Sequence, residues 1–132
     1  MTTDCICSAL RVAARKATAI YDEALAPVGI NVAQFGLLRK IGRAGTLSLS
    51  ELGRLAALDR STIGRNVQVL QRLGLVDIAA GDDLREASVA LAKPGRAALR
   101  RGKPLWEEAQ RSIEARLGGD GGAQLRALLA GL

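Results

Sequence analysis

The hydrophobic and polar positions of residues 59–73, DRSTIGRNVQVLQRL, separate onto two sides of a helix. One side is an apolar stripe made of Ile63, Val67, Leu70 and Leu73. The opposite side carries Ser61, Arg65, Gln68 and Arg72. Asp59 can cap the first turn, and Gly74 follows the last apolar position, where a left-handed stop suits glycine. This polar side offers hydroxyl, guanidinium and amide groups, which hydrogen-bond bases and phosphates; an ordinary amphipathic surface helix is the alternative.

The elements predicted before this helix give it a context. Asn31 can cap a helix that runs to about residue 43, and residues 46–48 are short enough for one strand. Ser50 can cap a second short helix over residues 51–57, and a tight turn at 58–59 follows it. The expected buried positions of these two helices are Phe35, Leu38, Ile41, Leu52 and Leu55. Helix, short turn and second helix with a polar outer side form the helix-turn-helix pattern.

After Gly74 the period changes from that of a helix to that of strands. Residues 75–78 are a short apolar run, residues 86–91 alternate, and Gly81 begins a turn signal between them. We therefore expect a β-hairpin with its tip at residues 82–85. A hairpin directly after a helix-turn-helix makes a winged helix, so the predicted fold class is mainly α with a small β-wing.

The two ends of the chain are predicted to be helical. Residues 5–26 repeat small and apolar side chains in steps of three and four, residues 93–117 form a long helix that Pro104 should kink, and Asp120 can cap a last helix. That last helix has an apolar side made of Leu125, Leu128, Leu129 and Leu132. We expect one domain over residues 1–132, with a DNA-binding lobe at about 31–92 and dimerisation helices at about 5–28 and 94–132. A plain bundle within one chain is the alternative use of these helices.

Composition narrows the function. The 132 residues carry a formal net charge of +6 at pH 7, which favours a polyanionic partner such as nucleic acid. The chain contains no histidine and only two cysteines, so we expect neither an enzyme nor a bound metal or cofactor. So few cysteines indicate a reducing cytoplasm, and no apolar run reaches the length of a membrane span.

The stretch SLSELGRLAALDRSTIGRNVQVLQRLGLV, the following DLR and the later VALAKPGRAAL resemble the MarR-type winged-helix regulators. The resemblance covers almost the whole chain. It implies a homodimeric, cytoplasmic transcription regulator, a repressor by type, that binds a pseudo-palindromic site in double-stranded DNA. It also implies that a small-molecule effector binds between the dimer helices and the DNA-binding lobe. Tyr21, Phe35 and Trp106 are candidate lining residues of such a pocket, and ordinary packing in the core is the alternative.

The resemblance also assigns roles at the DNA. Ser61, Thr62 and Arg65 would face the major groove, and Arg85 would enter the minor groove from the wing tip that Asp83 helps to hold. The phosphate contacts are expected from arginines at the edge of the site, and the complete candidate set is Arg60, Ser61, Thr62, Arg65, Asn66, Gln68, Arg72, Asp83 and Arg85, with Arg54 as a further phosphate contact. A winged helix that binds protein without DNA is the second hypothesis; an acidic recognition side would have favoured it.

Cys5 and Cys7 are candidates for redox sensing. One branch of the resembled family senses organic peroxides with a cysteine in a similar Cys-x-Ala-Leu context, which Cys7 fits. Thiols at a helix N-terminus feel the positive end of the dipole, and Arg11 lies one turn beyond Cys7. On a regular helix, side chains two residues apart point about 200° apart, so a Cys5–Cys7 disulfide requires a frayed end. Small residues that merely pack at a helix start are the alternative.

Overall fold

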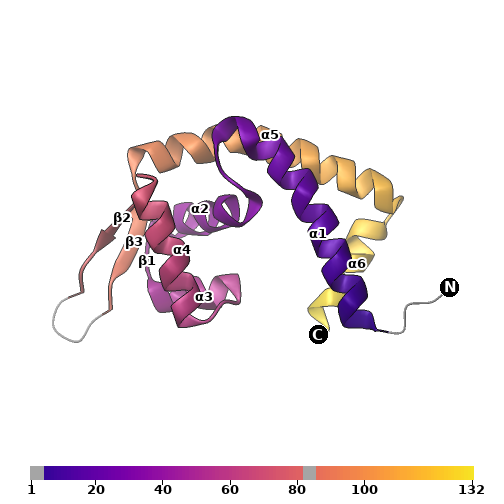
Figure 1. Ribbon diagram of the computed structural model, residues 1–132, viewed down its shortest axis with the longest axis horizontal. Coiled ribbons are helices and arrows are strands. Elements are labelled where there is room, and N and C mark those ends of the chain that lie inside the picture. The colour runs from indigo at the N-terminus through magenta and orange to yellow at the C-terminus, as the bar shows by residue number, and fades with distance from the viewer. Residues whose placement is uncertain (1–4, 82–85) are drawn as a thin grey trace.

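The long helix α5, Lys93–Leu117, runs along the molecule, and the other elements gather in two groups beside it (Figure 1). The computed structural model describes residues 5–81 and 86–132. The elements that precede α5 are α1 (Ile6–Leu25), the 3-10 helix η1 (Ala26–Val28), α2 (Val32–Ala44), β1 (Thr46–Ser48), α3 (Leu49–Ala56), α4 (Arg60–Arg72), β2 (Val76–Ala79) and β3 (Ser88–Leu91). One helix follows α5, namely α6 (Gly121–Ala130). This order confirms the predicted mainly helical winged helix-turn-helix.

The group at the N-terminal end of α5 is built around α2, α3 and α4. The fully buried side chains are Leu25, Phe35, Leu38, Ile41, Leu52, Ile63, Val67, Leu70 and Val89. The inward positions predicted for α2 and the first three positions of the apolar stripe on α4 are therefore confirmed. Their burial fixes the rotation of α4, so the opposite side of that helix faces outward.

Two predicted core leucines are exposed instead. Leu73 is 52% exposed because it is the C-cap of α4, where the helix ends and the stripe can no longer follow helical geometry. Leu55 is 54% exposed because α3 turns a different side inward. That side includes Leu52 and the buried Gly53, where an added Cβ would lie only 3.0 Å from the Leu58 carbonyl oxygen. With Leu52 and Gly53 buried, Leu55 lies outside the inward side of α3.

Side-chain caps fix the starts of α2, α3 and α4. Asn31 and Gln34 form a capping box on α2, and Asp59 accepts a hydrogen bond from the Thr62 backbone N–H at the start of α4. The predicted Ser50 cap of α3 is wrong. The cap is Ser48, because α3 begins two residues earlier and Glu51 completes a capping box with Ser48. Asp120 makes no side-chain capping hydrogen bond to α6, contrary to the prediction.

The described strands form one antiparallel sheet in the order β1-β3-β2. Leu47 of β1 pairs with Val89 of β3, and Val76 of β2 pairs with Leu91. The predicted hairpin is thus confirmed, while its tip at residues 82–85 lies outside the described residues. β3 begins at Ser88 rather than Glu86, whose side chain is bonded to Ser50. The central position of β3 ties the wing to the strand that precedes the helix-turn-helix.

The second group consists of α1, α6 and the C-terminal half of α5 (Figure 1). Trp106 of α5 stacks on Tyr21 of α1 and on Phe35 of α2, with ring centroids 6.3 and 5.8 Å apart. α5 continues through Pro104 without ending there. The aromatic stack therefore holds α5 to both groups of elements.

Candidate nucleic-acid interface

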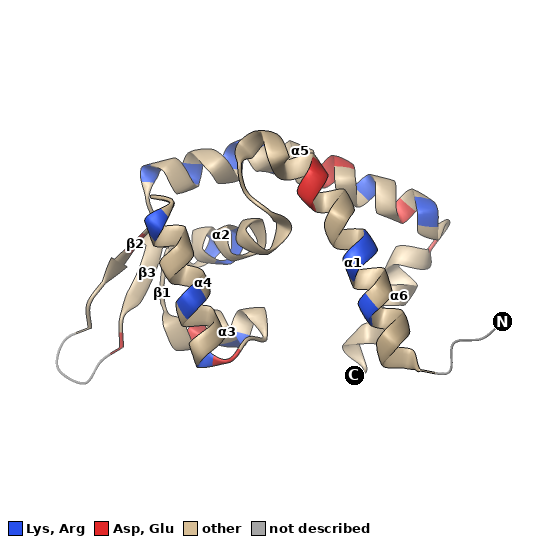
Figure 2. Ribbon diagram, viewed as in Figure 1, with Lys and Arg blue, Asp and Glu red and all other residues tan. Residues whose placement is uncertain are grey.

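The outer side of α4 presents a row of polar side chains to solvent. Ser61, Arg65, Gln68 and Arg72 are all exposed, as predicted, while the opposite stripe lies in the core. Figure 2 shows cationic positions at both ends and in the middle of α4. From Arg60 to Arg72 the helix contains no acidic residue. A row of guanidinium, hydroxyl and amide groups on a rigid helix matches the acceptors of base edges and phosphates.

Asp59 holds the first turn of this helix. Its Oδ1 accepts the Thr62 backbone N–H at 2.7 Å and the Ser61 hydroxyl at 3.1 Å. These hydrogen bonds, led by that from Thr62, hold the pKa of Asp59 below its usual range. At neutral pH the carboxylate therefore stays ionised and fixes the position of Ser61. The Arg65 guanidinium lies 3.4 Å from the Thr62 hydroxyl oxygen. Ser61, Thr62 and Arg65 therefore form one cluster around the Asp59 cap.

A second cluster joins the base of the wing to the helix-turn-helix. Glu86 accepts the Ser50 backbone N–H and the Ser50 hydroxyl, each at 2.7 Å, and its Oε1 lies 2.9 Å from Nη1 of Arg60. The bonds from Ser50, and then the charge of Arg60, lower the pKa of Glu86. Glu86 was not predicted, because it is 36 residues from Ser50 and no local pattern connects them. The cluster holds the first residue after the wing tip against α3 and α4.

The remaining predicted contacts are distributed unevenly. Asn66 is only half-exposed and lines a small hollow between α2 and α4 with Leu37 and Ala33, so it lies off the outer row. Arg54 is exposed at the end of α3. Asp83 and Arg85 lie outside the described residues. The outer row thus brings together Ser61, Arg65, Gln68 and Arg72, with Arg60 and Thr62 beside its start.

Comparisons with known proteins identify the family. A sequence profile of the MarR family matches residues 28–86, from η1 to the base of the wing. The transcriptional regulator MosR from M. tuberculosis, in a crystal structure with DNA, is 36% identical to this chain, with a TM-score of 0.87. That alignment covers 97% of this chain and 92% of MosR. The chain belongs to the MarR family.

Two further structures place this MarR-family chain among regulators. A probable transcriptional regulator from Pseudomonas aeruginosa is 34% identical, with a TM-score of 0.86 and coverage of 96% of both chains. A cysteine-to-serine mutant of MarR from E. coli, crystallised with operator DNA, is 25% identical, with a TM-score of 0.83 and coverage of 93% of this chain and 89% of that one. Comparison with curated proteins finds no match.

The cysteines of this MarR-family chain lie at the start of α1. Both are exposed, and Cys5 is the N-cap residue, with its sulfur 3.4 Å from the Ser8 backbone nitrogen. Hydrogen bonding to Ser8 lowers the pKa of the Cys5 thiol. Cys5 has an extended backbone and Cys7 is helical, so the regular-helix geometry that separates residues two apart does not apply to this pair. The Cys5 thiol is thus exposed at the N-terminal end of α1.

The three aromatic residues predicted to line an effector pocket do not share one cavity. Phe35 lines a cavity between α2 and α5, Tyr21 lines a separate hollow beside α6, and Trp106 lies between their rings. The Tyr21 hydroxyl donates to Oε1 of Gln110, and burial, followed by the charge of Glu114, raises the pKa of Tyr21. Within residues 5–81 and 86–132, no helix is long and apolar enough to cross a membrane. The same residues contain no group of three or more metal-ligating side chains.

Proposed function

We propose that this protein is a DNA-binding transcriptional regulator that reads an operator with the outer side of α4. The observation that carries the proposal is the capped, acid-free row of Ser61, Arg65, Gln68 and Arg72 on a helix fixed by its buried stripe. MosR and the MarR mutant, the relatives described above, were each crystallised with DNA, which supports the same use of this fold here.

The side chains of the interface divide into base-reading and phosphate-binding roles. Ser61, Thr62 and Arg65 read base edges in the major groove, where an arginine fork matches guanine. Arg72 and Arg54 bind phosphates, which position the lobe without specifying sequence. Arg60 contributes a phosphate contact with the part of its guanidinium that Glu86 leaves to solvent, since the side chain is 55% exposed. Arg85 enters the minor groove beside the half-site.

The protein acts as a homodimer through α1, α6 and the end of α5. Exposed apolar side chains remain on these helices, and the most exposed are Ile6 on α1 and Leu128 on α6, each at 75%. A second copy that covers these side chains would remove apolar surface from water. Two copies of α4 related by a two-fold axis then bind a pseudo-palindromic site with half-sites about 10 base pairs apart.

Release from DNA follows oxidation of the N-terminal thiols or binding of a small ligand. The lowered pKa of exposed Cys5 favours the nucleophilic thiolate at the start of α1, one of the proposed dimer helices. A disulfide there would change how α1 packs and hence the spacing of the two α4 helices. The regulator is proposed to act in the cytoplasm as a repressor and to perform no chemical reaction of its own.

Selection from a random duplex pool tests the DNA-binding proposal. We expect a two-fold symmetric motif, and Arg65→Ala should weaken binding to it by about 1–3 kcal/mol with relaxed base preference. Arg111→Ala is the matched control, because Arg111 is an exposed arginine on α5, away from α4. Enrichment of no motif, or equal losses in the two variants, would contradict the proposal. A protein-only winged helix would show neither a motif nor a steep loss of binding with salt.

A further inference from the structure

A carboxylate lies at the edge of the DNA-reading side, although α4 itself contains no acidic residue. Glu86 belongs to the segment that leads into β3, and it directly follows residues 82–85, the predicted wing tip. Its side chain is 32% exposed and contacts Ser50 near the start of α3 and Arg60 at the start of α4. A carboxylate repels DNA phosphates, so this position weakens DNA binding unless the group has a second effect there.

Both oxygens of Glu86 hold the first turn of α3. Oε1 accepts the Ser50 backbone N–H and Oε2 accepts the Ser50 hydroxyl, each at 2.7 Å. That N–H is one of those in the first turn that have no partner within the helix. The pairing of β1 with β3 continues into the hydrogen bond from the Leu49 N–H to the Ala87 carbonyl oxygen, at 3.3 Å. Glu86 therefore extends the attachment of β3 to the lobe by one further residue toward the wing tip.

The same carboxylate partly neutralises Arg60. Nη1 of Arg60 lies 2.9 Å from Oε1 of Glu86 and 3.1 Å from the Ser50 hydroxyl oxygen. The Arg60 side chain is 55% exposed, so water and salt weaken this attraction without removing it. A guanidinium that is bonded to a carboxylate has less of its charge and fewer N–H groups left for a DNA phosphate.

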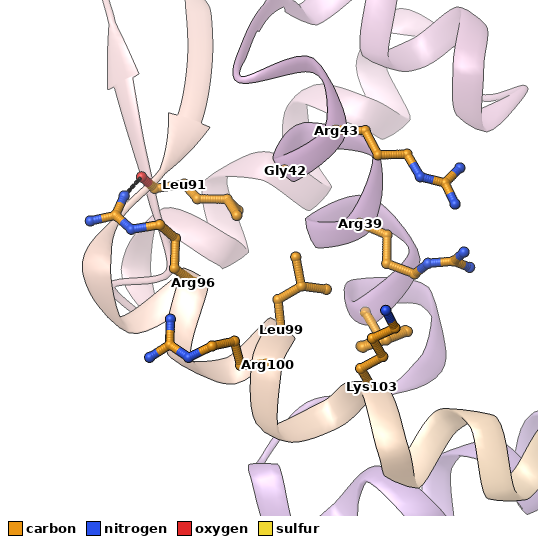
Figure 3. A pocket seen from close by; sticks show the side chains of 9 residues that line it. Arg39, Gly42, Arg43, Leu91, Arg96, Leu99, Arg100 and Lys103 are labelled. Carbon is orange, nitrogen blue, oxygen red and sulfur yellow. Dashed lines mark hydrogen bonds between the residues drawn. The ribbon is translucent and has the colours of Figure 1, made fainter.

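This pairing is confined to one arginine of the DNA-reading side. Within residues 5–81 and 86–132, the two salt bridges join Arg60 to Glu86 and Arg126 to Glu114. Arg65 and Arg72 of the outer row take part in neither of them. The arginines around the cavity between α2 and α5 (Figure 3) take part in neither as well. The described chain thus places an acid beside the one arginine that also lies next to the wing base.

We propose that Glu86 is a positioning residue that raises the selectivity of DNA binding while lowering its overall strength. This role rests on the proposed function of the outer row. Glu86 fixes the base of the wing relative to α4, so less chain motion has to be arrested when both meet their grooves on an operator. Random DNA is held mainly through its phosphates and gains less from this fixed geometry. The share of Arg60 that Glu86 takes removes part of a phosphate contact and weakens binding to every sequence.

Fluorescence anisotropy of the full chain on two labelled duplexes tests this role. One duplex is the operator selected by the parent, and the other is a scrambled duplex of the same composition. Glu86→Gln keeps the size of the side chain and removes its charge, so it should bind the scrambled duplex more tightly than the parent. For each bound chain, this gain should be about threefold larger at about 50 mM than at about 200 mM salt, because one phosphate contact is added. The ratio of operator affinity to scrambled affinity should fall about threefold to tenfold.

Three further variants separate the two effects. Asp77→Asn is the matched control, because it removes an exposed acid of β2 and changes the net charge equally. Its selectivity should equal that of the parent. Ser50→Ala removes the hydroxyl bond to Glu86 but keeps the carboxylate beside Arg60, so selectivity should fall while the salt dependence stays unchanged. In an Arg60→Gln background, Glu86→Gln should raise the affinity for the scrambled duplex no more than Asp77→Asn does.

Two results would overturn the role of Glu86 alone. Equal effects of Glu86→Gln and Asp77→Asn on both duplexes would show that net charge alone matters. Unchanged selectivity in both Glu86→Gln and Ser50→Ala would show that the contact does not position the wing. A parent that binds the two duplexes equally would instead overturn the proposed function, and the role of Glu86 with it.

Discussion

Replacing Gly95 with alanine tests how closely α5 packs on the segment between α4 and the wing. Gly95 is buried, and an added Cβ would lie 1.9 Å from the carbonyl oxygen of Leu75. Real Cβ atoms essentially never approach closer than 3.0 Å, so the two backbones would have to separate by at least 1.1 Å. The same oxygen accepts the Ala92 N–H at 3.0 Å, and this bond would lengthen or break.

The expected loss of stability follows from these contacts. Overpacking costs about 1–3 kcal/mol and the weakened hydrogen bond about 1 kcal/mol, while the helix preference of alanine returns about 0.5–1 kcal/mol. We expect Gly95→Ala to lower the free energy of unfolding by about 1–3 kcal/mol. At an m-value of about 1–3 kcal/mol/M, the urea midpoint should fall by about 1 M.

Gly36→Ala is the matched control for this measurement. It adds the same methyl group within α2, where the nearest described atom outside the helix's own backbone is Nζ of Lys40 at 3.9 Å. We expect it to raise stability by about 0.5–1 kcal/mol. Urea unfolding should be followed by circular dichroism at one protein concentration, because dimerisation makes stability depend on concentration. If Gly95→Ala matches or exceeds Gly36→Ala in stability, the close approach of α5 to Leu75 is wrong.

Three further outcomes are expected. Asp59→Ala should be less stable than the parent at neutral pH. Urea unfolding across pH should show this difference in stability vanish as the pH falls below 3.8, the usual pKa of the carboxyl, and through the lower pKa of the folded state. A difference in stability that does not depend on pH would contradict the cap. Glu86→Gln should steepen the salt dependence of duplex binding by about one ion, because Arg60 loses its carboxylate partner; an unchanged slope would count against that pairing. An organic hydroperoxide should weaken operator binding by the parent but not by Cys5→Ser, which lacks the N-cap thiol. Equal responses of the parent and this variant in operator binding and on non-reducing gels would leave the thiols as packing.

The parts of the fold that could be predicted were those encoded by local periodicity. Ile63, Val67 and Leu70 recur at the helical period and are buried, so the outward direction of Arg65 followed from the sequence. The helix starts were predicted where one capping residue stood alone, as at Asp59. At the start of α3 the sequence offers both Ser48 and Ser50 as caps, and the helix begins after Ser48, which forms a full capping box with Glu51.

The parts that could not be predicted depend on contacts between distant segments. The carboxylate of Glu86 contacts Ser50, which is 36 residues away in the sequence. Hydrophobic periodicity predicts which side of a helix is buried but not which distant segment packs against that side. The cavity between α2 and α5 that Phe35 lines has the same origin, because these two helices meet only in the folded chain. The prediction that Leu55 is buried was wrong for a local reason. Gly53 is buried but carries no hydrophobic signal in the sequence, so the inward side of α3 was assigned to the wrong residues.

The junction between β3 and α5 makes the long helix a lever. Only Ala92 separates the central strand of the sheet from the helix, and its N–H is bonded to Leu75, so the fulcrum sits at the base of the wing. With 25 residues, α5 extends about 37 Å from that fulcrum. A tilt of about 5° there displaces the far end by about 3 Å. A displacement of the far end of α5 by repacking of α1 and α6 therefore corresponds to only a small rotation of the helix at the sheet.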